Sequence, residues 1–140
     1  MNPRHADALH LLGVIAHQVG RHEDAADLIR QAVALAPDVP DYHSNLGEVH
    51  QALGQTDDAV ANLQVALKLR PQHPAAQNNL GNALRAQGRI DEAVLAYRRA
   101  LEIKPDFAAA HNNLGVVLST QGKMDEALAA YEGSVFGPWR

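Results

Sequence analysis

The chain has 140 residues, a mass of 15.1 kDa and a formal net charge of −4, with 46% hydrophobic and 20% charged residues, as expected for one folded domain. Its lack of cysteine excludes a disulfide framework, a thiolate zinc site and a cysteine nucleophile. A pI near 6.0 and only 4% aromatic residues argue against a nucleic-acid partner, which requires a basic face or a stacking platform.

The first apolar stretch, residues 9–19, could be mistaken for a targeting segment. His10, His17 and Gln18 interrupt it, so we expect no signal peptide. No stretch approaches the roughly 18 apolar residues that a membrane-spanning helix requires. The sequence therefore predicts a soluble chain, cytoplasmic by default, with no membrane partner.

A period of 34 residues runs through the chain. It is defined by two glycine columns, a leucine column, an alanine column and a proline column: Gly13, Gly47, Gly81 and Gly115; Gly20, Gly54, Gly88 and Gly122; Leu12, Leu46, Leu80 and Leu114; Ala25, Ala59, Ala93 and Ala127; Pro37, Pro71 and Pro105. Internal repeats of this length indicate a repeat architecture. We assign four repeats in a single domain, residues 6–39, 40–73, 74–107 and 108–140.

Each repeat predicts, in chain order, a first helix, a turn and a second helix. In residues 74–107, apolar residues recur at helical spacing on both sides of Gly88. Glycine suits the left-handed position that ends a helix because it has no Cβ. Asp91 and Glu92 then favour the positive end of the second helix, and Pro105 ends it. The chain is therefore predicted to be all-α, built from four helix hairpins.

Gly81 lies inside a first helix, where glycine costs about 1 kcal/mol relative to alanine. We interpret it as the place where the second helix of the hairpin approaches closely, opposite the small Ala93. Leu80, Leu84 and Tyr97 would fill the space around this contact.

The order of Leu80-Gly81, Ala93, Tyr97, Ala100 and Pro105 resembles the tetratricopeptide repeat family. The resemblance covers nearly the whole chain. It implies a right-handed α-solenoid whose concave wall is lined by the first helices and binds other proteins. The chain departs from the family where a large aromatic residue is expected early in each first helix. Those positions hold Leu9, His43, Gln77 and His111.

Asparagine is frequent on the side of the first helices that packing does not use. The candidate peptide-binding residues are Asn45, Asn79 and Asn113 in one column, Ser44, Asn78 and Asn112 in its neighbour, and Glu48, Asn82 and Arg85 beside them. An asparagine amide offers one acceptor and two donors, as a peptide bond does, so a ladder of amides can hold an extended backbone. The alternative is that these consensus residues only solvate the helices or help to pack adjacent repeats.

Comparison with two subfamilies helps to predict what kind of partner segment this chain binds. The asparagine column resembles the inner wall of the repeat domain in O-linked N-acetylglucosamine transferases, which implies contacts to a peptide backbone. Another subfamily clamps acidic tails of heat-shock chaperones with basic residues. Here Asp7 and Asp41 stand where basic residues would start the helices, His10 stands in place of a lysine and Asn79 in place of an arginine. We reject that clamp and expect a mildly basic ligand segment.

Neither catalysis nor a metal or cofactor is expected. His10 and His17, like His43 and His50, are seven residues apart. This spacing gives a rise of about 10.5 Å, too far for two imidazoles to hold one ion. No serine stands in a nucleophile elbow. We predict no enzyme activity from this chain alone.

The last repeat becomes irregular after Tyr131, with no polar capping helix, and we expect its second helix to fray near Gly133. Either the chain is a fragment of a longer array, or its exposed ends, with Phe136 and Trp139, are used for self-association. The sequence predicts a scaffold that binds an extended segment of a partner protein. The alternatives are the substrate-recruiting portion of a larger glycosyltransferase-like enzyme and a module that assembles through uncapped ends.

Overall fold

The computed structural model describes residues 3–137, and these residues form eight helices and no strand. The helices are α1 (Pro3–Gln18), α2 (His22–Leu35), α3 (Pro40–Ala52), α4 (Thr56–Leu69), α5 (Pro74–Ala86), α6 (Ile90–Ile103), α7 (Ala108–Thr120) and α8 (Met124–Phe136). They form two compact units, a first that ends at Pro71 and a second that begins at Gln72. The predicted all-α class is confirmed. Trp139, which was considered with Phe136 for self-association, lies outside the described residues.

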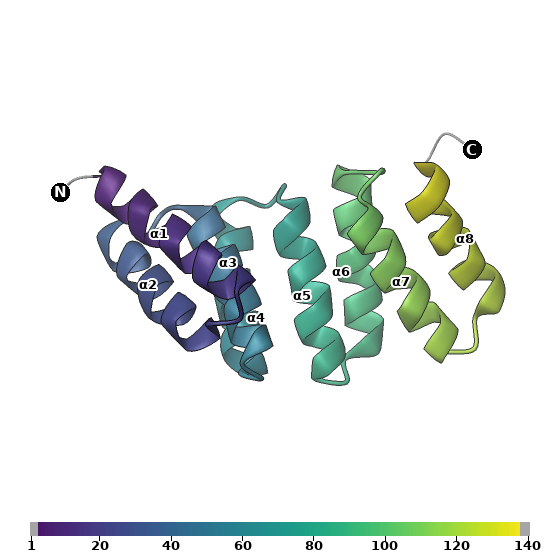
Figure 1. Ribbon diagram of the computed structural model, residues 1–140. Helices are drawn as coiled ribbons and strands as arrows, with labels where there is room; N and C mark the ends of the chain where they lie inside the picture. The colour runs from purple at the N-terminus through teal and green to yellow at the C-terminus, as the bar shows by residue number, and fades with distance from the viewer. Residues whose placement is uncertain (1–2, 138–140) are drawn as a thin grey trace. The chain divides into compact units, whose positions relative to one another are not determined.

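Each repeat folds as a helix hairpin. α1 packs on α2, α3 on α4, α5 on α6 and α7 on α8, and Figure 1 shows these pairs in chain order from purple to yellow. The four turn glycines have φ between 74° and 85°, the left-handed conformation predicted for them. Acidic residues occupy the first turn of every second helix, where they interact favourably with the helix dipole.

A close contact between helices explains Gly81 in α5. A Cβ at this position would lie 2.5 Å from Cε1 of Tyr97 in α6, so only glycine permits this approach. The predicted close approach is confirmed, and the atoms nearest to a Cβ at Gly81 belong to the ring of Tyr97. Tyr97 stands one turn beyond Ala93 on the same side of α6. In the first unit, a Cβ at Gly47 would meet Cγ of Leu63 at 2.7 Å.

Each unit builds its own core where a second helix meets the first helix of the next repeat. In the first unit, Ala25, Ala26 and Ile29 of α2 cluster with Leu46 and Val49 of α3. The core of the second unit joins α5, α6, α7 and α8, and its buried members are Leu84, Ala93, Ala96, Tyr97, Leu114, Val117, Leu118, Ala127 and Ala130. Stacking thus supplies the core that a single hairpin lacks.

Histidine replaces the expected aromatic residue at the start of two first helices. Nε2 of His43 lies 2.7 Å from the carbonyl oxygen of Pro37, and Nε2 of His111 lies 2.7 Å from that of Pro105. A ring N–H donates in this geometry. A hydrogen bond to the preceding turn therefore substitutes for part of the aromatic packing.

The last helix, α8, continues through Gly133 and ends at Phe136, so the prediction of fraying near Gly133 is wrong. A Cβ at Gly133 would lie 2.5 Å from Cε1 of His111 in α7, which means that the glycine makes room for the imidazole. Oγ of Ser134 donates to the carbonyl oxygen of Tyr131 at 3.0 Å. Packing on α7 offsets the cost of about 1 kcal/mol that glycine brings to a helix.

Candidate functional site

A strip of polar side chains runs along the first helices of each unit, and we call it the first-helix face. In the first unit it lies on α1 and α3. The hydroxyl of Tyr42 donates to a carboxylate oxygen of Asp7, and Nδ2 of Asn45 lies 2.7 Å from Nε2 of His10. Side-chain hydrogen bonds therefore link the first helices of two successive repeats.

In the second unit the first-helix face lies on α5 and α7. Nδ2 of Asn113 donates to Oδ1 of Asn78 at 3.0 Å, and the two residues are 35 positions apart, as are the asparagine and histidine bonded in the first unit. Oδ1 of Asn82 accepts a hydrogen bond of 2.6 Å from the hydroxyl of Tyr97. Some asparagines of this face thus join helices within the unit.

The candidate peptide-binding residues differ in exposure. Ser44 and Asn78 are 2% and 6% exposed, so the expectation that their column faces solvent is wrong for these two. For Asn78 the reason is α7, whose Asn113 lies against it. Five candidates are half-buried, namely Asn45, Asn79, Asn82, Arg85 and Asn113, and two are exposed, Glu48 and Asn112.

The half-buried amides keep part of their bonding capacity. Asn113 uses one N–H for Asn78, and since an asparagine has one acceptor and two donors, its carbonyl oxygen and second N–H can serve another partner. Asn45 uses its amino group at His10 and keeps its Oδ1. Each further neutral hydrogen bond contributes about 1 kcal/mol. The first-helix face can therefore hydrogen-bond the backbone of an extended peptide.

The bond between His10 and Asn45 is made by a neutral imidazole. Burial lowers the pKa of His10 below its usual value, and the carboxylates of Asp41 and Asp7 oppose part of this shift. With Nε2 unprotonated, the ring accepts the hydrogen that the Asn45 amide donates.

The candidate residues from the sequence left out two members of this face. His10 stands in the column of Ser44 and Asn78, so its place on the face could have been read from the sequence, but its bond to Asn45 could not. Tyr42 gives no such signal, because the same column otherwise holds alanines. Its hydrogen bond to Asp7 of α1 therefore has no equivalent in the other repeats.

Two tyrosines joined to the first-helix faces should make the protein sensitive to alkali. Burial, and then the hydrogen bond to Asp7, raise the pKa of Tyr42 to about 12. Burial raises the pKa of Tyr97 to about 12, against a smaller opposite effect of Arg85. Because both values exceed the ordinary 10.0, the associated stability is complete below pH 10 and is lost as the pH rises towards 12. Urea unfolding across this range should show a falling free energy of unfolding.

The variant Tyr42→Phe is the control for this pH dependence. It removes one ionising hydroxyl, so the decline should be shallower, although the bond to Asp7 is lost at every pH. Tyrosinate absorbance reports the ionisation directly. If all tyrosines titrated together near pH 10, the assignment would be wrong.

Several histidines make pairwise contacts. Nδ1 of His17 lies 2.9 Å from Nδ1 of His22, and Nδ1 of His50 lies 2.6 Å from Oε1 of Gln55. Among residues 3–137, no group of three or more His, Asp or Glu side chains is placed to hold a metal ion. These histidine contacts join α1 to the start of α2 and α3 to the start of α4.

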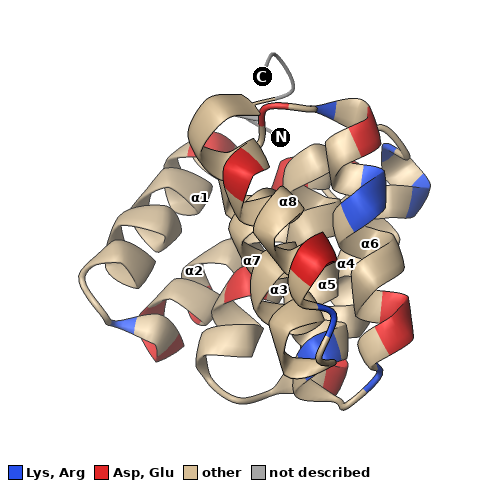
Figure 2. Ribbon diagram, turned by 90° about the vertical axis from the view of Figure 1, so that its right-hand side faces the viewer, with Lys and Arg blue, Asp and Glu red and all other residues tan. Residues whose placement is uncertain are grey.

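The first-helix face of the first unit is acidic. Asp7, Asp41 and Glu48 are exposed there, and Nε2 of His17 lies 4.0 Å from Oε1 of Glu48. In the view of Figure 2, Lys and Arg residues stand singly or in small groups among Asp and Glu residues. None of the described helices combines the length and the apolar character needed to cross a bilayer.

Comparison with protein families gives three matches. Tetratricopeptide repeat models match residues 1–40 and 50–95, and a TPR repeat model matches residues 81–122. Together the matches reach all four repeats. No curated protein sequence matches the chain.

Solved structures share the fold. A crystal structure of MamA is 25% identical, with a TM-score of 0.82, over 96% of this chain and 78% of that one. A thermophilic TPR protein of Thermus thermophilus is 22% identical, with a TM-score of 0.85, over 93% and 73%. The first TPR of Spaghetti (RPAP3), bound to the HSP90 peptide SRMEEVD, is 22% identical, with a TM-score of 0.81, over 87% and 97%.

Proposed function

Because this chain belongs to the tetratricopeptide repeat family, we propose that it is a protein-interaction scaffold that binds an extended segment of a partner protein. The observation that carries the proposal is the first-helix face, where half-buried asparagine amides are oriented by neighbouring side chains. The backbone clamps are Asn45 in the first unit and Asn79 and Asn113 in the second unit. The partners are proteins, not nucleic acid or membrane, and the chain acts by binding and not by catalysis.

The charge of the first unit indicates what kind of segment binds there. Asp7, Asp41 and Glu48 would repel an acidic ligand such as SRMEEVD, the peptide held by the RPAP3 structure. They favour a segment that carries Lys or Arg. Because these carboxylates are exposed, they affect encounter rate and selectivity more than affinity, and added salt weakens the binding modestly.

The test is a binding screen with libraries of unstructured peptides, one basic and one acidic. The wild type is compared with the triple variant Asn45→Ala, Asn79→Ala and Asn113→Ala. With about 1 kcal/mol for each amide, the variant should lose roughly fivefold in affinity for a peptide held by the first unit, which has one clamp, and roughly thirtyfold for one held by the second unit, which has two. Fluorescence anisotropy of the labelled peptides gives the Kd of each protein.

Asn62→Ala is the matched control. Asn62 is a half-buried asparagine of the second helix α4, and its Nδ2 donates to the carbonyl oxygen of Asp58 at 2.9 Å. This variant loses an asparagine hydrogen bond away from the first-helix face, so it should bind peptides as the wild type does. Thermal unfolding of every variant separates a packing role, which changes Tm, from a binding role, which changes Kd. Equal binding by wild type and triple variant would refute the clamp, and no capture of any peptide would refute the proposed function.

Self-association is a second candidate function. It is favoured by exposed apolar residues on the first and last hairpins, among them Ile15 at 55% and Leu128 at 55% exposure. Single exposed apolar residues are ordinary on protein surfaces, but contiguous ones mark interaction sites.

A further inference from the structure

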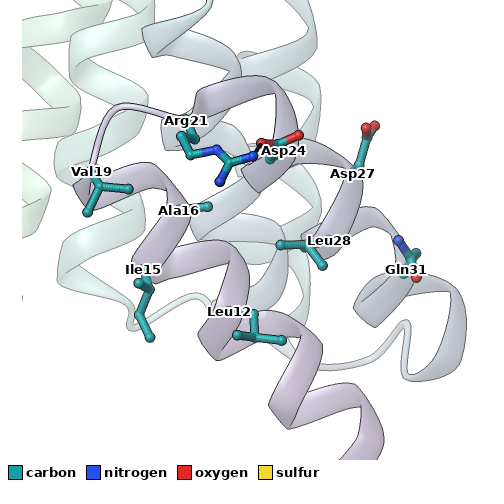
Figure 3. A pocket seen from close by; sticks show the side chains of 9 residues that line it. All are labelled: Leu12, Ile15, Ala16, Val19, Arg21, Asp24, Asp27, Leu28 and Gln31. Atoms are coloured by element: carbon teal, nitrogen blue, oxygen red, sulfur yellow. Dashed lines mark ion pairs between the residues drawn. The ribbon is translucent and has the colours of Figure 1, made fainter.

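The first hairpin presents an apolar surface that we call the α1 face. It consists of Leu12, Ile15, Ala16 and Val19 on α1 and Leu28 on α2, around an open groove of about 460 Å³. Leu12, Ile15 and Val19 are 54%, 55% and 68% exposed. Figure 3 shows these side chains along α1, with the ion pair of Arg21 and Asp24 at the end of the groove.

The last hairpin presents a second apolar surface, the α8 face. It consists of Met124, Leu128 and Val135, which are 56%, 55% and 73% exposed. Their spacing of four and seven residues places them along one side of α8. The first and the last described hairpins therefore each carry an exposed apolar stripe on a helix.

In the first unit, the second repeat has residues equivalent to the α1 face, and these residues are covered by the first repeat. Leu46, Val49 and Leu53 of the α3 hairpin follow Leu12, Ile15 and Val19 by 34 residues. Leu46 and Val49 are only 5% and 1% exposed, because they pack, with Leu53, in one cluster with Ala26 and Val33 of α2.

The internal residues that are equivalent to the α8 face form the other half of that contact. Ala26 and Val33 of α2, and Val94 and Leu101 of α6, correspond to Leu128 and Val135, and the internal residues all belong to the packed clusters. Between α6 and α7, Val94 and Leu101 pack against the cluster that contains Leu114 and Val117. The α8 face and the α1 face are thus the two halves of an interface that each unit already forms once.

Side-chain sizes at the two end faces differ from those at the internal contacts. The repeat positions equivalent to Leu128 hold the smaller Ala26 and Val94, and those equivalent to Ala16 hold the larger His50 and Leu118, both buried. The large Leu128 of the α8 face can therefore meet the small Ala16 in the groove of the α1 face.

We propose that the α8 face of one copy docks on the α1 face of a second copy, head to tail, with Leu128 seated in the groove over Ala16. This inference rests on self-association, the second of the functions proposed above, and is independent of peptide capture. Because the two faces differ, each docked copy leaves one face of each kind unused, so the assembly grows until it closes into a ring or remains an open filament.

The test uses the full chain with one face blocked at a time. Ile15→Glu blocks the α1 face and Leu128→Glu blocks the α8 face, while Leu95→Glu on α6, a leucine of similar exposure at 54%, is the control away from both. Light scattering and sedimentation measure mass against concentration. The average mass of the wild type and of Leu95→Glu should rise with concentration. A buried glutamate should weaken docking at least about thirtyfold, so each blocked variant alone should be monomeric.

Mixing the two blocked variants tests whether the copies dock head to tail. Each retains the face that the other lacks, so an equimolar mixture should form a dimer and nothing larger. A wild type that stays monomeric at every concentration refutes self-association itself. Association of one blocked variant with itself, or a mixture that stays monomeric while the wild type assembles, refutes the head-to-tail mode. Val19→Glu and Val135→Glu, at 68% and 73% exposed positions, repeat the test if circular dichroism shows that a first variant is unfolded.

Discussion

Replacing Tyr97 with alanine is expected to lower the free energy of unfolding of the second unit by about 3 to 5 kcal/mol. The ring is fully buried at 0% exposure, lies over Gly81 and donates its hydroxyl to Asn82 at 2.6 Å. The backbone of α5 cannot collapse into the space left behind without moving the whole hairpin. Urea unfolding followed by far-ultraviolet circular dichroism measures the loss.

Two variants separate the parts of this effect. Tyr97→Phe keeps the ring and removes only the bond to Asn82, so it should cost about 1 kcal/mol. Tyr131→Ala changes the same repeat position in α8, where the ring is only half-buried, and should cost clearly less than Tyr97→Ala. If Tyr97→Ala and Tyr97→Phe were equally stable, the ring would not support the hairpin as described.

Replacing Gly47 with leucine should destabilise the first unit by about 3 kcal/mol, at the upper end of the roughly 1 to 3 kcal/mol that overpacking typically costs. Its Cβ would lie 2.7 Å from Cγ of Leu63 and 3.3 Å from the carbonyl oxygen of Ala59, and the rest of the side chain has no space between α3 and α4. The better helix propensity of leucine recovers less than about 1 kcal/mol. Thermal and urea unfolding give the difference.

Ala52→Leu provides the control for Gly47→Leu. Ala52 is exposed at the end of the same helix, so the same new side chain should change the free energy of unfolding by less than about 0.5 kcal/mol. Stabilisation by Gly47→Leu would show that the helices separate easily, contrary to the close contact.

The periodic columns were sufficient to predict the fold. A glycine every 34 residues located each turn, and positive φ at Gly88 and its equivalents confirms that reasoning. The columns also identified Gly81 as a contact point. They could not show that the ring of Tyr97 supplies the nearest atoms, because period alone gives the side of a helix and not the depth to which each side chain reaches.

The asparagine columns illustrate a second limit. Their place on the first helices could be read from the sequence, but the bond between Asn78 and Asn113 depends on how near adjacent helices lie and on the orientation of an amide. The prediction for Gly133 failed for the same reason, because the sequence does not show contacts between helices. The low helix propensity of this glycine suggested fraying, and the imidazole of His111 that fills the space beside it comes from another helix.

The spacing of 35 residues in the bonds His10–Asn45 and Asn78–Asn113 bears on how such a chain changes length. Each bond joins one column to the adjacent column of the next repeat. Duplication or deletion of whole 34-residue segments keeps the two columns in step, whereas an insertion of one or two residues within a first helix rotates its later residues by part of a helical turn. These hydrogen bonds therefore tolerate changes in the number of repeats but not in the length of a first helix.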